Sequence, residues 1–111
     1  MNDDPEPDWK LKLRYGRLTT PFQHYFVLAE GVAGALRAGF DCPAGPAFMG
    51  MKAWAASPEE ARHMAAVIGR DIGFDANGRI DIYEAEASQP PRENPFGYDI
   101  RFTPFNEDGR Q

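Results

Sequence analysis

Cysteine is nearly absent from this chain, and its scarcity removes two common sources of stability in small domains. The 111 residues include one cysteine, Cys42, so neither an intrachain disulfide nor a cysteine-rich metal cage can form. A single thiol is typical of proteins that work in a reducing compartment. We therefore expect a cytoplasmic protein that folds without metal or cofactor.

Long apolar runs are missing as well. No segment approaches the roughly 18 consecutive apolar residues that a membrane-spanning helix requires. The first eight residues are acidic and contain two prolines, a composition that differs from that of a signal peptide. The sequence therefore predicts no membrane association.

Basic residues are fewer than acidic residues in this chain. The chain has 12 Lys and Arg against 17 Asp and Glu, which gives a net charge of −5. Because phosphate contacts need a positive surface, this balance argues against nucleic acid as a partner. It leaves open a basic protein as a partner.

What the chain does contain is enough apolar material for one core. Hydrophobic residues make up 42% of the sequence and aromatic residues 13%, and a chain of this length buries roughly two-thirds of its surface on folding. The composition predicts a single domain over residues 9–105. Residues 1–8 and 106–111 are polar and predict disordered tails.

The stretch of residues 9–15 shows the strictest pattern in the sequence. Trp, Leu, Leu and Tyr alternate with Lys10, Lys12 and Arg14, and a period of two predicts a strand with one buried face. The three basic side chains are candidates for binding an anionic partner. The simpler interpretation is that they share the outer sheet face with Asp81 and Asp99 and balance their charge.

Four more strands are predicted over residues 24–29, 48–55, 79–87 and 96–103, with the last two close together as a hairpin. A short helical turn is expected at 32–37, followed by a loop rich in Gly and Pro. The clearest local signal begins at Ser57, an N-cap candidate followed by Pro58 and by Glu60 of a capping box. The apolar stripe of the helix then runs to a stop at Gly73, through Ala61, Met64, Ala65, Ile68 and Ile72.

This order, β-β-β-α-β-β, predicts an α+β fold in two layers. A five-stranded mixed or antiparallel sheet would carry one main amphipathic helix on one face, and the strands on either side of that helix would run parallel in one sheet. One helix of about fifteen residues cannot cover five strands. The remaining apolar surface must therefore meet the long loop or another subunit.

No motif in the sequence specifies a reaction. Gly45 and Gly50 have the spacing of a P-loop, but Met51 and Lys52 stand where that motif needs Lys and Ser or Thr. The two histidines and one cysteine are too few for a convincing zinc site. The acids near the last two strands are more simply explained by ion pairing than by an acid-pair active site: Asp81, Glu84, Glu86, Glu93 and Asp99.

Two functional hypotheses follow. The first is a small non-catalytic accessory or protein-binding module that forms a homodimer or docks onto a larger, possibly basic protein. The second is a small enzyme or ligand-binding domain with a pocket under the loop of residues 38–47. In that second case His24, Asp41 and Cys42 would supply the polar groups.

Overall fold

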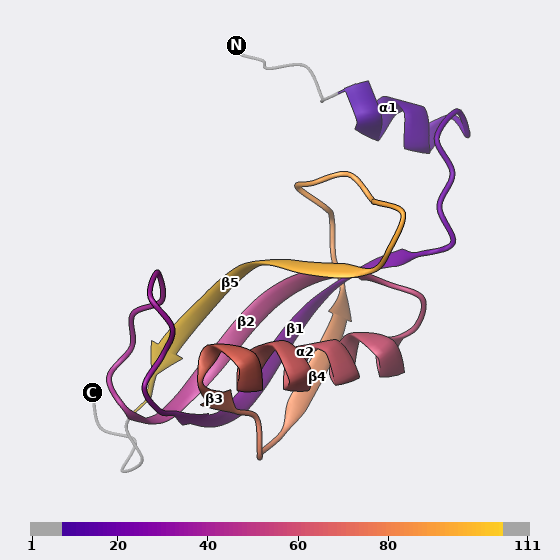
Figure 1. Ribbon diagram of the computed structural model, residues 1–111. Coiled ribbons are helices and arrows are strands. Elements are labelled where there is room, and N and C mark those ends of the chain that lie inside the picture. The colour runs from indigo at the N-terminus through magenta and orange to yellow at the C-terminus, as the bar shows by residue number, and fades with distance from the viewer. Residues whose placement is uncertain (1–7, 106–111) are drawn as a thin grey trace.

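The computed structural model describes residues 8–105, in which an antiparallel sheet carries one long helix (Figure 1). The elements in chain order are α1 (Asp8–Arg14), β1 (Gln23–Ala33), β2 (Gly45–Ala55), α2 (Pro58–Ile72), β3 (Phe74–Asp75), β4 (Ile80–Glu84) and β5 (Phe96–Pro104). The α+β fold with one main helix and a five-stranded sheet is therefore confirmed.

The strand β1 lies at the centre of the sheet. It pairs along its full length with β2, and β5 pairs with the far edge of β2. The other edge of β1 is shared by β4, along residues 25–29, and β3, along residues 32–33. Since β2 and β4 are both antiparallel to β1, they run in the same direction, as the sequence predicts for the strands around the helix.

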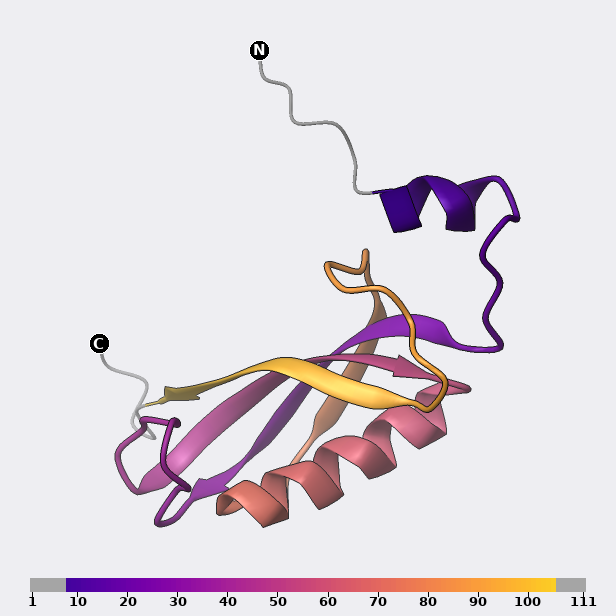
Figure 2. The same ribbon diagram turned by 45° about the horizontal axis from the view of Figure 1, so that its top comes forward.

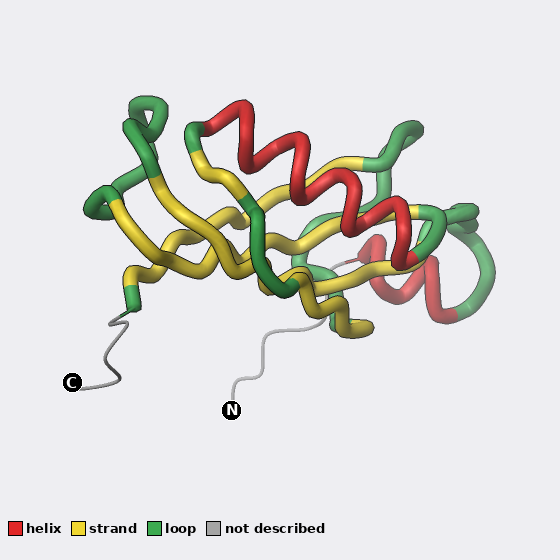
Figure 3. The backbone as a smooth tube through the Cα atoms, turned by 90° about the horizontal axis from the view of Figure 1, so that it is seen from below, coloured by secondary structure: helices red, strands yellow, loops and turns green. Residues whose placement is uncertain are grey.

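The main core forms between α2 and one face of the sheet (Figure 3). Odd-numbered side chains of β1 and β2, such as Val27 and Met49, are fully buried there, because alternate residues of a strand point to the same face. The helix contributes small residues, Ala61, Ala65 and Gly69. A Cβ atom at Gly69 would stand 3.2 Å from the ring of Phe74, so the helix and the sheet pack closely at this point.

The predicted signals at both ends of α2 are confirmed. The Ser57 hydroxyl accepts a hydrogen bond from the backbone N–H of Glu60 at 3.1 Å, and Pro58 begins the helix. The Glu60 carboxylate accepts from the N–H of Ala56 rather than that of Ser57, so the capping box is displaced by one residue. Gly73 ends the helix with a φ of 120°, and its N–H bonds to the last turn.

The prediction of a strand at residues 9–15 is wrong, because this stretch forms α1. Trp9 and Leu13 lie one turn apart and pack against a second apolar cluster, so the same residues that alternate in sequence also share a helix face. The backbone N–H groups of Arg17 and Leu18 bond to the Lys12 carbonyl after Gly16 takes a φ of 76°. This arrangement is typical of a helix C-terminus.

Smaller corrections concern boundaries and partners. No helical turn forms at residues 32–37, because β1 continues to Ala33 and a loop follows. The short strand β3 is absent from the prediction, and β4 ends at Glu84. β4 and β5 lie at opposite edges of the sheet and form no hairpin. Asp8 belongs to α1, while the rest of the two predicted tails lies outside the described residues.

Candidate functional site

His24 stands at the start of β1 in a network of hydrogen bonds that joins β1 and β5 to the loop between β4 and β5. Its Nδ1 lies 2.9 Å from the carbonyl oxygen of Ala85, and its Nε2 lies 2.8 Å from the hydroxyl of Tyr98. The Tyr98 oxygen also accepts from the backbone N–H groups of Ser88 and Gln89, at 3.0 and 3.3 Å. The network therefore fixes the loop between β4 and β5 to the end of the sheet.

The geometry of this network favours a neutral His24. A carbonyl oxygen can only accept, so Nδ1 carries the proton and Nε2 accepts from the Tyr98 hydroxyl. His24 is 8% exposed, and burial is the main reason why the pKa of its imidazole is lowered from 6.5, with a further contribution from Lys52. A lowered pKa beside a cleft is a common property of a catalytic base. Here both ring nitrogens are already engaged, which fits an anchor better than a base.

A groove opens beside His24, between α1 and the end of the sheet, and we call it the end groove. Its volume is about 700 Å³, and Figures 1 and 2 show α1 standing beyond the strands next to the loop from β4 to β5. Apolar walls come from Trp9, Leu13, Phe22 and Trp54. The residues of the loop 38–47 do not line the end groove.

The predicted basic row is balanced within the molecule, although by other acids than expected. Lys10 forms an ion pair with Glu86 at 3.0 Å, and Lys12 forms one with Asp8 at 3.2 Å. Arg14 also acts on Glu86, whose pKa is lowered mainly by its hydrogen bond to Lys10. Asp81 and Asp99, the acids expected to balance this row, lie instead on β4 and β5. This arrangement gives no support to an anion-binding row.

The structure does not place Asp41 and Cys42 beside His24 in the end groove. The loop that holds Asp41 and Cys42 leaves β1 at Ala33, nine residues and roughly 30 Å along the strand from His24. Cys42 instead packs against the main core. Of the three residues, only His24 lines the end groove.

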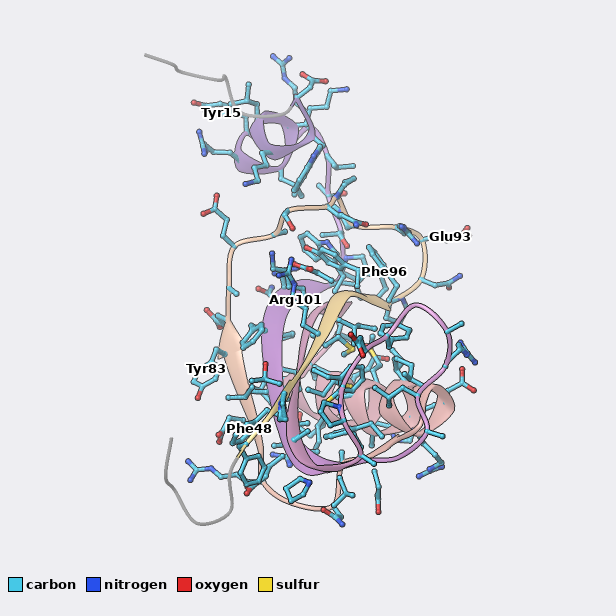
Figure 4. The ribbon with its side chains drawn as sticks, turned by 90° about the vertical axis from the view of Figure 1, so that its left-hand side faces the viewer. Tyr15, Phe48, Tyr83, Glu93, Phe96 and Arg101 are labelled. Atoms are coloured by element: carbon cyan, nitrogen blue, oxygen red, sulfur yellow. The ribbon has the colours of Figure 1, made fainter. Side chains whose placement is uncertain are left out.

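The sheet face opposite α2 carries a band of side chains that sequence reasoning did not identify. We call it the open face, and Figure 4 labels Tyr83, Phe48 and Arg101 on three of its strands. Register and alternation assign its members: Phe26, Leu28 and Glu30 of β1, Phe48, Gly50 and Lys52 of β2, Asp81 and Tyr83 of β4, and Asp99, Arg101 and Thr103 of β5. The signal lies in the even-numbered positions of β1 and β2, which include Phe26, Leu28 and Phe48 where a solvated face would be polar.

The apolar part of the open face is organised around a ridge of Leu28 and Phe48. These two residues line a hollow of about 320 Å³ on the β5 side and another of about 210 Å³ on the β4 side. The ring of Phe26 lies over Gly50, where a Cβ would approach it to 3.2 Å, and stacks on Tyr83 with centroids 6.5 Å apart. Tyr83 is 51% exposed, so this aromatic surface is accessible.

Charged side chains flank the ridge on both sides. On the β5 side, Asp99 lies 3.1 Å from Lys52 and 3.2 Å from Arg101, and hydrogen bonds from both cations lower the pKa of its carboxyl. Asp99 has a φ of 53° where the β2–β5 register shifts; Asp tolerates this conformation better than most residues. The predicted preference for ion pairing is thus confirmed for Asp99.

On the β4 side of the ridge, Asp81 pairs with Arg79 at 2.9 Å. Glu30 lies beside them, and no cation among residues 8–105 comes within ion-pair distance of its carboxylate. Two acids therefore face one base on this side, whereas two bases face one acid on the β5 side.

Comparison with known proteins adds no relationship, because no family, no curated protein and no solved structure matches this chain. Within residues 8–105, no group of three or more His, Cys, Asp or Glu side chains is arranged to hold a metal ion. The helices of this same region are too short or too polar to cross a membrane.

Proposed function

We propose that this protein is a non-catalytic binding module that docks onto a protein partner through the open face of its sheet. The observation that carries this proposal is the apolar band on the face that α2 does not cover, where Tyr83 is exposed and Phe26, Leu28 and Phe48 are half-buried. Covering apolar surface is favourable by roughly 25 cal/mol per Å². An apolar centre with a charged rim is also the usual anatomy of a protein interface.

The way in which the titratable groups are used supports a module without catalysis. Both ring nitrogens of His24 are hydrogen-bonded, one to Ala85 and the other to Tyr98. The carboxylates of Asp81 and Asp99 form ion pairs with neighbouring cations. Catalysis needs a nucleophile or base with a free site for its substrate. The residues near the end groove and on the open face instead act as anchors and as a rim.

The proposal is tested by photo-crosslinking in cells that produce the full chain. Replacement of Tyr83 by p-benzoylphenylalanine keeps an aromatic group on the open face, and we expect a specific crosslink to an identifiable protein. The matched control places the same group at Val67 of α2, which is 43% exposed. Equal crosslinking from positions 83 and 67 would contradict docking through the open face.

A second function, the binding of a small apolar ligand, is favoured by the end groove. Its volume of about 700 Å³ lies within the usual range for ligand sites. Trp9 and Trp54 line it and are the two tryptophans of the chain. The dye 8-anilinonaphthalene-1-sulfonate should therefore change the tryptophan emission on binding.

The control for this ligand site is Leu13→Asp, which places a carboxylate in the groove wall. We expect this variant to lose binding of the dye while the hydrogen-exchange protection of α2 stays that of the wild type. If the dye binds the variant and the wild type equally well, the end groove is not its site.

A further inference from the structure

We propose that the open face pairs with the open face of a second copy of this chain, with the two-fold axis parallel to the strands. This inference rests on the proposed function, since it names the partner that the apolar band accepts. It is carried by the shape of the face and, independently, by the distribution of its charges.

The shape of the open face suits contact with itself. A two-fold interface uses the same patch on both copies, so that patch must hold both projections and recesses. The ridge of Leu28 and Phe48, whose side chains are half-buried, separates two hollows of about 320 and 210 Å³. The ridge of one copy can therefore enter a hollow of the other, and face-to-face sheets of this kind pack with their strands within about 30° of each other.

The charges of the open face select the direction of the axis. The β5 side has one positive charge in excess, since Lys52 and Arg101 face Asp99. The β4 side has one negative charge in excess, since Glu30 and Asp81 face Arg79. Rotation by 180° about an axis along the strands exchanges the two sides, so each surplus charge meets its opposite. An axis across the strands would bring like sides together.

The same balance favours a second copy over a basic partner. The open face is neutral as a whole although the chain carries a net charge of −5, so a basic protein would gain little at this face. A neutral surface with opposite signs at its two sides is complementary to itself. Arg101 is 81% exposed, which leaves it free to approach Glu30 of the other copy.

Charge exchange between two variants tests this arrangement. Arg101→Glu and Glu30→Arg each place two like-charge contacts in the homodimer, and we expect each to weaken self-association about tenfold or more in sedimentation velocity. An equimolar mixture of the two should recover the wild-type affinity, because both contacts in the mixed dimer are then between opposite charges. The double variant Arg101→Glu/Glu30→Arg should recover it as well.

The control for charge alone is Arg62→Glu, which makes the same change at an exposed position of α2 and should leave the affinity unchanged. Circular dichroism and thermal melting check that every variant is folded. If the purified wild type stays monomeric at millimolar concentration, or if the mixture fails to recover, the paired arrangement is wrong. A monomeric wild type that still crosslinks to another protein through position 83 would overturn the dimer and leave the proposed function standing. If the wild type is monomeric and position 83 gives no specific crosslink, both the dimer and the proposed function are wrong.

Discussion

His24 shows how a single buried polar residue can organise the end of a sheet. Its ring lies 5.0 Å from that of Trp54, edge to face, and its two nitrogens reach the loop at Ala85 and the strand β5 at Tyr98. The Trp54 indole N–H donates to the carbonyl of Gln89 at 2.8 Å. Because every donor and acceptor of this network has a partner, adding a proton to His24 would break a bond rather than make one.

A pH dependence of stability follows from this network. The folded state holds the pKa of His24 below its ordinary value of 6.5, so the unfolded chain takes up the proton first as the pH falls. The free energy of unfolding should therefore decrease as the pH falls from about 6.5 to the folded pKa, and above that window His24 should contribute no pH dependence. Urea titrations of the wild type and of His24→Gln at pH 7.5 and 5.5 measure the difference.

His63 supplies the control for this pH effect, since it is an exposed residue of α2. We expect His63→Gln to keep the pH dependence of the wild type, whereas His24→Gln should lose the part that comes from the buried ring. A wild type whose stability relative to His24→Gln is the same at both pH values would show that His24 titrates normally.

At the scale of elements, β3 and α1 are stabilised by contacts with residues that are distant in sequence. The two residues of β3 pair with Val32 and Ala33 of β1, and this close approach is possible because Gly31 has no side chain. A Cβ at position 31 would overlap the backbone carbonyl oxygen of Asp75. Backbone atoms cannot rotate away as the end of a side chain can, so the position tolerates only glycine without rearrangement.

We therefore expect Gly31→Ala to destabilise the fold by roughly 1–3 kcal/mol, the usual cost of overpacking. The matched control is Gly34→Ala, where the added Cβ would lie 3.3 Å from the nearest atom, and a much smaller loss is expected. Chemical denaturation of the three proteins gives the comparison. Equal stabilities of Gly31→Ala and Gly34→Ala would show that the β3 backbone moves freely.

The helix α1 depends on its docking. A helix of seven residues is marginal on its own, and Trp9 and Leu13 hold it against the cluster of Trp54, Ala87 and Tyr98. We expect Leu13→Ala to lower the hydrogen-exchange protection of residues 9–15 by about tenfold or more while α2 keeps its protection. Leu11, 37% exposed on the same helix, is the control, and Leu11→Ala should change little. Equal effects of the two substitutions would contradict the docking of α1 through Leu13.

Within residues 8–105, α2 covers one sheet face, whereas the other face is covered only in part. The helix α2 buries the odd-numbered side chains of β1 and β2, whereas α1 and the loop from β4 to β5 cover only the His24 end of the other face. The open face remains, with its ridge of Leu28 and Phe48 between charges of opposite sign. The proposed dimer would cover it.

Association of this kind makes thermal stability depend on concentration. Because folded copies that bind each other are stabilised by mass action, the melting temperature of the wild type should rise when the protein is concentrated about a hundredfold. Phe48→Glu should abolish that rise, and Val67→Glu on α2 should preserve it. Scanning calorimetry or fluorescence melting at several concentrations gives the result, and a melting temperature independent of concentration in the wild type would contradict the dimer.

The elements that could be predicted are those whose signals are local. Ser57, Pro58 and Glu60 act within one helical turn, so their hydrogen bonds need no knowledge of the rest of the chain. The apolar run at residues 25–29 predicts a central strand for a similar reason, since the signal lies in five adjacent residues. The expectation that one helix cannot cover the sheet likewise needed only a comparison of the area of a fifteen-residue helix with that of five strands.

The residues that bring distant segments together could not be predicted in the same way. His24 and Tyr98 are 74 positions apart, and nothing near either residue indicates the other. Lys10 pairs with Glu86 instead of Asp81 or Asp99, because α1 docks beside the loop and not in the sheet. The alternation of residues 9–15 was satisfied equally by a strand and by a helix with Trp9 and Leu13 on one face.

By itself the sequence determined the helix α2, most of the strands and the presence of surplus apolar surface, because capping, periodicity and composition act over a few residues. The tertiary structure alone decided that residues 8–14 are helical, that His24 is an anchor, and that the surplus surface is the open face. These outcomes depend on which segments pack together. Where the local sequence is compatible with two structures, packing between distant segments determines which of them forms.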